Sequence, residues 1–120
     1  MKLRIKGNTI RLRLTRTEVA EIGAGREVRE VTEFSPNSQF SYALQASVNE
    51  VVTAKFENNG MYIFLPQAMS AAWAANDEVG IEADQDQLKI IIEKDFACLS
   101  PRGEEDSDTF EHPMIGQTVC

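Results

Sequence analysis

Residues 10–22, IRLRLTRTEVAEI, are matched by residues 61–73, MYIFLPQAMSAAW, at an offset of 51. The apolar positions of the two stretches coincide, pairing Ile10, Leu12, Leu14 and Ile22 with Met61, Ile63, Leu65 and Trp73. A unit of roughly 50 residues buries so little surface that it is marginally stable by itself. We therefore expect two copies of one unit to share a single core.

Apolar and polar residues alternate over residues 2–6 and 10–14, with Gly7-Asn8-Thr9 between them. A period of two is typical of half-buried strands, and the intervening residues favour a tight turn. This region is therefore predicted to form a β-hairpin with one apolar and one cationic side. The cationic side would carry Lys2, Arg4, Lys6, Arg11 and Arg13.

A short helix is predicted after each of the two matched strands. Thr15 and Glu18 have the spacing of a capping box, and Gly23 and Gly25 would end that helix after about two turns. In the second copy Pro66 suits a first helical position. The residues expected to face the core are Val19 and Ile22 in the first helix and Met69, Ala72 and Trp73 in the second.

The remaining strands give both copies the order ββαββ. They are predicted at residues 27–34, 39–47, 51–57, 61–65, 79–83 and 88–93. We expect a mainly β (α+β) fold, a barrel or a sandwich of two pseudo-equivalent halves. One domain would cover residues 1–99, with repeats at 2–47 and 51–94, and residues 100–120 would form an acidic, partly extended tail.

The charge of the chain is unevenly distributed. The net charge is -7, yet six of the twelve basic residues precede the first acidic one. No apolar run approaches the roughly 20 residues of a membrane span, and no signal-peptide pattern follows Met1, so we expect a cytoplasmic protein without membrane contact. Two cysteines are too few for a disulfide scaffold, and reduced thiols are expected.

The hairpin sequence resembles that of the swapped-hairpin (AbrB/MazE-type) antitoxins and transition-state regulators. The first copy has the turn Gly7-Asn8-Thr9 and the arginines of residues 10–14, and the second has Leu65-Pro66, then Trp73, then Asp77-Glu78-Val79. The resemblance implies that two halves exchange hairpins over residues 2–94. It also implies DNA contact by basic hairpin arms, with Arg13 at the family's hairpin arginine and Arg4 and Lys6 before the glycine.

The second copy departs from this pattern, because Tyr62 and Phe64 stand where the first has Arg11 and Arg13. Only one cationic arm is therefore expected. The whole chain, including Lys94-Asp95-Phe96 and Asp108-Thr109-Phe110, also resembles a family of small uncharacterised bacterial proteins. The chain would be a monomeric pseudo-dimer or a homodimer.

Three interpretations of the cationic hairpin side are open: it binds nucleic acid or another polyanion, it is a solvated outer surface, or the acidic tail covers it. An alternative function is an antitoxin-like protein-interaction module that uses the tail and a surface formed by Tyr62, Phe64 and Phe110. The structural alternative for Tyr62 and Phe64 is burial of both hairpin faces within one domain.

A third, weaker possibility is a metal site. Cys98, His112 and Cys120 are residue types that bind zinc, but their spacing matches no established zinc motif, and a buried Cys98 is the alternative. Otherwise no cofactor is expected. We do not expect an enzyme, because the single histidine lies in the acidic tail and no nucleophile stands in a catalytic motif.

Overall fold

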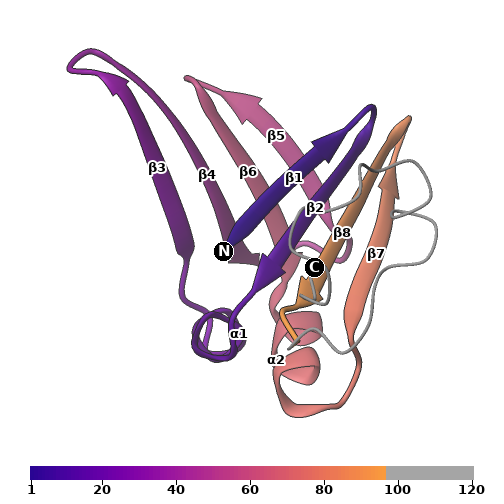
Figure 1. Ribbon diagram of the computed structural model, residues 1–120. Coiled ribbons are helices and arrows are strands. Elements are labelled where there is room, and N and C mark those ends of the chain that lie inside the picture. Colours follow the sequence, from indigo (N-terminus) through magenta and orange to yellow (C-terminus); the bar gives the residue numbers. More distant parts are fainter. Residues whose placement is uncertain (97–120) are drawn as a thin grey trace, which may run out of the picture.

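The structure is a computed structural model that describes residues 1–96 (Figure 1). Eight strands and two helices follow one another in the order ββαββ–ββαββ, as predicted. Their bounds are β1 (Lys2–Lys6), β2 (Thr9–Leu14), α1 (Arg16–Gly23), β3 (Val28–Ser35), β4 (Ser38–Ser47), β5 (Thr53–Glu57), β6 (Gly60–Pro66), α2 (Gln67–Ala75), β7 (Gly80–Gln85) and β8 (Leu88–Lys94).

The strands form two four-stranded sheets, each of which combines strands from both copies. Sheet A has the order β1-β2-β8-β7, and sheet B has the order β3-β4-β6-β5. In each sheet the first hairpin of one copy lies beside the second hairpin of the other, through the parallel pairs β2–β8 and β4–β6. The two copies have therefore exchanged hairpins.

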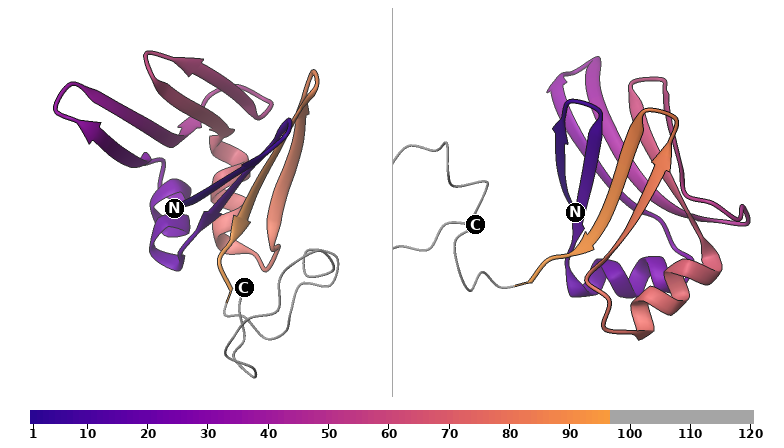
Figure 2. Two further views of the ribbon diagram at one scale, coloured as in Figure 1. Left: turned by 45° about the horizontal axis from the view of Figure 1, so that its top comes forward. Right: turned by 90° about the vertical axis from the view of Figure 1, so that its right-hand side faces the viewer.

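The sheets face one another but do not close into a barrel. They lie together at the end where both helices pack and separate toward the hairpin tips (Figures 1 and 2). Within residues 1–96 no backbone ladder joins sheet A to sheet B. The closed-barrel alternative is therefore wrong for this part of the chain, and the arrangement is sandwich-like.

One hydrophobic core lies between the sheets and the helices. Leu12 and Leu14 of the first copy and Ile63 and Leu65 of the second are all 0% exposed. The helices add Ile22 from α1 and Trp73 from α2, at equivalent positions of the repeat. The duplicated apolar positions thus meet in one core, as expected for a unit too small to close its own.

Helix α1 matches its prediction and α2 differs in detail. Both capping-box hydrogen bonds between Thr15 and Glu18 are present. Helix α2 begins at Gln67, so Pro66 is its N-cap residue and not its first helical residue. Its buried residues are Ser70 and Trp73, whereas Met69 and Ala72 are exposed.

The buried side of α2 is determined by its contact with α1. A Cβ atom built on Gly23, the last residue of α1, would lie 2.4 Å from the Cβ of Ala74. The same position is 3.5 Å from the carbonyl oxygen of Ser70. Helix α1 therefore approaches α2 along Ser70 and Ala74, and this contact turns Met69 toward solvent.

Polar contacts connect the two sheets at both of their edges. At one edge, the amino group of Met1 pairs with Glu18 of α1 at 2.5 Å and with Glu30 of β3 at 2.9 Å, and Tyr42 Oη donates to the Met1 carbonyl oxygen. At the other, Gln85 of β7 accepts from Ala54 N at 2.7 Å and donates to Ala54 O at 3.1 Å. The side-chain amide of Gln85 thus makes the two hydrogen bonds to Ala54 that a neighbouring strand would make at the free edge of β5.

The Met1–Glu18 ion pair makes stability depend on pH. Burial alone would lower the pKa of the Met1 amine, but the hydrogen bonds and charges of Glu18 and Glu30 outweigh it and raise that pKa above 8.0. Burial alone would raise the pKa of Glu18, but its bonds to the Met1 amine and to Thr15 lower it below 4.5. The stabilisation is complete between these values and is lost as pH falls through the lowered pKa or rises through the raised one.

We predict that Glu18→Gln lowers the free energy of unfolding most between about pH 5 and 8, with a smaller effect outside that window. Glutamine retains the capping-box geometry, so the variant removes mainly the charge. Urea unfolding at a series of pH values measures the difference, and Glu21→Gln on the same helix is the control. A difference between wild type and Glu18→Gln that stays constant from pH 3 to 10 would contradict the prediction.

We predict that Gly23→Ala destabilises the protein by about 1–3 kcal/mol, because the new methyl group overlaps Ala74 across the helix contact. Ala74→Gly removes the opposing methyl group. The double variant should therefore be more stable than the sum of the two single effects predicts, which a double-mutant cycle by urea unfolding measures. Wild-type or greater stability of Gly23→Ala would show that the helices do not touch there.

Candidate polyanion-binding face

The five predicted cations share the outer face of sheet A. In the β1–β2 ladder Lys2 lies opposite Arg13 and Arg4 lies opposite Arg11. Directly opposed residues of antiparallel strands project to the same side of a sheet. Because the alternate residues Ile10, Leu12 and Leu14 are buried, the basic residues project outward.

Acidic side chains of the second copy neutralise part of this face. Glu93 of β8 lies in register with Arg13 of β2. Arg13 donates to Glu93 Oε1 from Nε at 3.0 Å and from Nη2 at 2.9 Å. Arg11 Nη1 lies 3.4 Å from both Glu93 oxygens, a longer contact, so Arg13 is the main partner of Glu93.

A second counter-ion lies at the end of the face nearest the helices. Lys2 Nζ is 3.5 Å from Asp95 Oδ2, and the lysine side chain remains 76% exposed. The contact is therefore an exposed ion pair that contributes little to stability. Together Asp95 and Glu93 place the acidic partners toward the helix end of the sheet.

The hairpin-tip end of the face differs from the helix end. There Arg4, Lys6, Thr9 and Arg11 line a shallow hollow of about 170 Å³. Lys6 has no ion-pair partner within residues 1–96. A hollow lined by three cations and a hydroxyl group suits an anionic oxygen group such as phosphate.

The sequence interpretation missed Glu93 and Asp95 as members of this site. Both residues are distant in sequence from the first hairpin and reach it only because β8 pairs with β2. The hairpin exchange implied by the family resemblance was the signal for this proximity. The acidic tail, the third interpretation of the cationic face, lies outside the described residues.

The equivalent face of sheet B carries Tyr62 and Phe64, both half-buried. The guanidinium carbon of Arg29 lies 5.5 Å from the centroid of the Tyr62 ring, a distance typical of a cation–π contact. A residue of β3 in the same chain thus covers part of this aromatic surface. Phe110, the third predicted partner-binding residue, lies outside the described residues.

The predicted metal ligands Cys98, His112 and Cys120 also lie outside the described residues. Residues 1–96 contain no group of three or more histidine, cysteine, aspartate or glutamate side chains suited to a metal ion. No helix in this part of the chain is long and apolar enough to cross a membrane.

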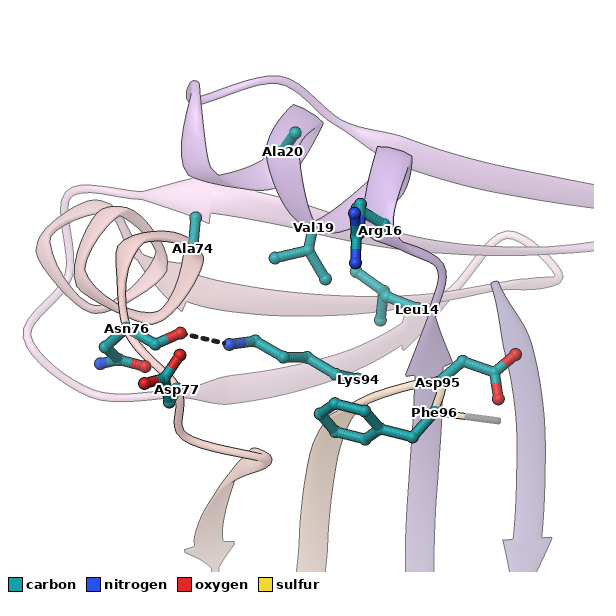
Figure 3. A pocket seen from close by; sticks show the side chains of 10 residues that line it. All are labelled: Leu14, Arg16, Val19, Ala20, Ala74, Asn76, Asp77, Lys94, Asp95 and Phe96. Carbon is teal, nitrogen blue, oxygen red and sulfur yellow. Dashed lines mark hydrogen bonds between the residues drawn. The ribbon is translucent and has the colours of Figure 1, made fainter. Parts of the chain in front are cut away.

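A larger cavity, of about 410 Å³, lies beside the helices (Figure 3). Leu14, Val19 and Phe96 supply apolar walls, and Arg16 and Lys94 supply cations. Lys94 Nζ already donates to the Asn76 carbonyl oxygen at 2.7 Å and lies 5.5 Å from the Trp73 ring. This ammonium group has partners within the fold, whereas Lys6 in the hollow at the hairpin tip has no ion-pair partner within residues 1–96, so that hollow is the better candidate anion site.

A known protein family matches almost the whole chain. A search of curated proteins finds no match. The model of a family of unknown function, DUF7009, matches residues 1–114, which include both copies of the repeat and most of the acidic segment. This agrees with the resemblance to an uncharacterised family, and the chain belongs to the DUF7009 family.

Proposed function

We propose that this protein binds a polyanion, such as nucleic acid, through the outer face of sheet A. The observation that carries the proposal is the β1–β2 register, which gathers five cations on one face of a chain whose net charge is -7. Such segregation concentrates positive potential locally, where it acts within a Debye length of about 10 Å at 0.1 M salt.

The hairpin exchange supports the same proposal. Parallel β2–β8 and β4–β6 pairs join hairpins of different copies, an arrangement that agrees with the resemblance to swapped-hairpin regulators. In those families a basic hairpin arm contacts DNA. Here only the first copy has such an arm, since Tyr62 and Phe64 replace its arginines, so we infer contact on one side only.

The counter-ions determine which cations take part. Arg13 is held closely by Glu93, whereas Arg11 makes the longer contacts and also lines the hollow with Arg4 and Lys6. We infer that the hairpin tip contacts the ligand first. Few phosphate contacts imply moderate affinity that falls as salt rises, by roughly 0.7–0.9 log units per contact for each tenfold increase in salt.

We predict that Arg4→Glu lowers affinity for a fluorescein-labelled DNA duplex by roughly tenfold at 50 mM salt, because it places repulsion beside the anionic oxygens. Fluorescence anisotropy measures the affinity. Lys55→Glu is the matched control, since it makes the same charge change at the equivalent position of the second copy. Equal losses in both variants would indicate an effect of net charge alone, and absence of wild-type binding to both DNA and heparin at low salt would refute the proposal.

We also predict that Glu93→Gln strengthens binding several-fold in the same assay, since it releases Arg11 and Arg13 from their counter-ion. Glu82→Gln on the neighbouring strand β7 changes the net charge equally and is the control. A stronger effect of Glu82→Gln than of Glu93→Gln would show that the arginine pair does not contact the ligand. Circular dichroism establishes that both variants are folded.

A further inference from the structure

Strand β3 is an edge strand whose outer half is exposed on both faces. It is the first strand of sheet B, so one side of its backbone has no partner strand within residues 1–96. Val31 and Phe34 are 52% and 72% exposed, and the strand is regular from Val28 to Glu33, before a β-bulge near its tip. The β3–β4 hairpin extends away from the rest of the molecule (Figure 1). Exposed, apolar strand edges are sites where another strand adds.

The other three edges carry features that disfavour pairing with a second copy. The edge of β5 is occupied at Ala54 by the Gln85 side chain. Self-pairing of β1 would bring Lys2, Arg4 and Lys6 against one another, and self-pairing of β7 would bring together Glu82 and Asp84. Like charges on an edge strand oppose such association.

The sequence of β3 is instead complementary to itself. Its first seven residues are Val-Arg-Glu-Val-Thr-Glu-Phe. If two copies of β3 run antiparallel about Val31, Arg29 of one lies opposite Glu33 of the other on the outer face. On the other face, Glu30 meets Thr32, whereas Val28 is buried in the core and Phe34 lies at a β-bulge. Each of these pairs occurs twice because the axis is twofold.

We propose that a second copy of this chain pairs with β3 in this register, so that the two B sheets join into one continuous sheet. The occupant is a second copy because the charge complementarity of Arg29 with Glu33, and the contact of exposed Val31 with Val31 at the twofold axis, are both properties of the strand against itself. In this register odd-numbered residues lie opposite odd-numbered ones and even-numbered residues opposite even-numbered ones. The N–H and C=O groups that point away from β4 in one copy therefore meet the same groups of the other copy, as an antiparallel ladder requires. The twofold axis closes the assembly at a dimer.

The side chains that form the pair are accessible. The Arg29 side chain is 39% exposed and contacts Glu27 through Nε at 2.7 Å and Nη2 at 3.3 Å. A guanidinium group has five N–H donors, more than the two that bond to Glu27, although Tyr62 also contacts this group. Glu33 is exposed and has no ion-pair partner within residues 1–96.

A charge-exchange experiment on the full chain tests the proposal. Sedimentation equilibrium over a range of concentrations should show wild type associating from 13.4 kDa to twice that mass. Glu33→Arg and Arg29→Glu should each weaken dimerisation by tenfold or more, because like charges then oppose one another. An equimolar mixture of the two variants should form a heterodimer, since each charge again meets its opposite.

Three outcomes would overturn the proposal: a wild type that remains monomeric at millimolar concentration, a dimer unaffected by Glu33→Arg, or a mixture of variants that stays monomeric. Glu82→Arg, on the β7 edge of sheet A, is the control and should leave association unchanged. Circular dichroism shows whether each variant is folded. Because β3 lies in sheet B and the cationic face in sheet A, the result is independent of polyanion binding.

Discussion

The parallel pairing of β2 with β8 and of β4 with β6 is the constraint on which the structure depends. Each pair joins a hairpin of one copy to a hairpin of the other, so neither copy completes a sheet alone. The same pairing brings Leu12 and Ile63, equivalent residues of the two copies, into one core at 0% exposure. The two copies therefore form one folding unit, and the apolar residues that they have in common are the residues buried in its core.

Local features of this fold and the sharing of one core by the two copies were predictable from the sequence, whereas individual long-range side-chain contacts were not. The alternation of apolar and polar residues predicted the strands. The capping box was predictable because Thr15 and Glu18 are only three residues apart, and both of its hydrogen bonds are present. The Arg13–Glu93 pair depends on a parallel contact between opposite ends of the described chain, which no local pattern encodes. Likewise, burial of Ser70 in place of Met69 follows from the close approach of α1 at Gly23.

The exchange also determines the chemistry of the cationic face. The five cations belong to the first copy, but Glu93, the acid held by Arg13, belongs to the second. A hairpin that paired only within its own copy would not bring Glu93 beside Arg11 and Arg13. Because β8 brings Glu93 toward the helix end, the acid lies beside Arg13, and the hollow lined by Lys6 and Thr9 lies at the opposite end of the face. The face is thus a product of both copies, although its basic residues come from one.

Two sheets that do not close leave four strand edges, and the chain treats them differently. Strands β1 and β7 carry charges of one sign, and Gln85 fills hydrogen-bonding positions on β5. Strand β3 has neither of these features and has a β-bulge only near its tip, between Glu33 and Ser35, and it exposes Val31 and Phe34. An isolated edge of this kind favours indiscriminate pairing. The alternating order of Arg29, Val31 and Glu33 restricts that pairing to one register, because any shift along the strand brings a charge against an apolar residue or against its like.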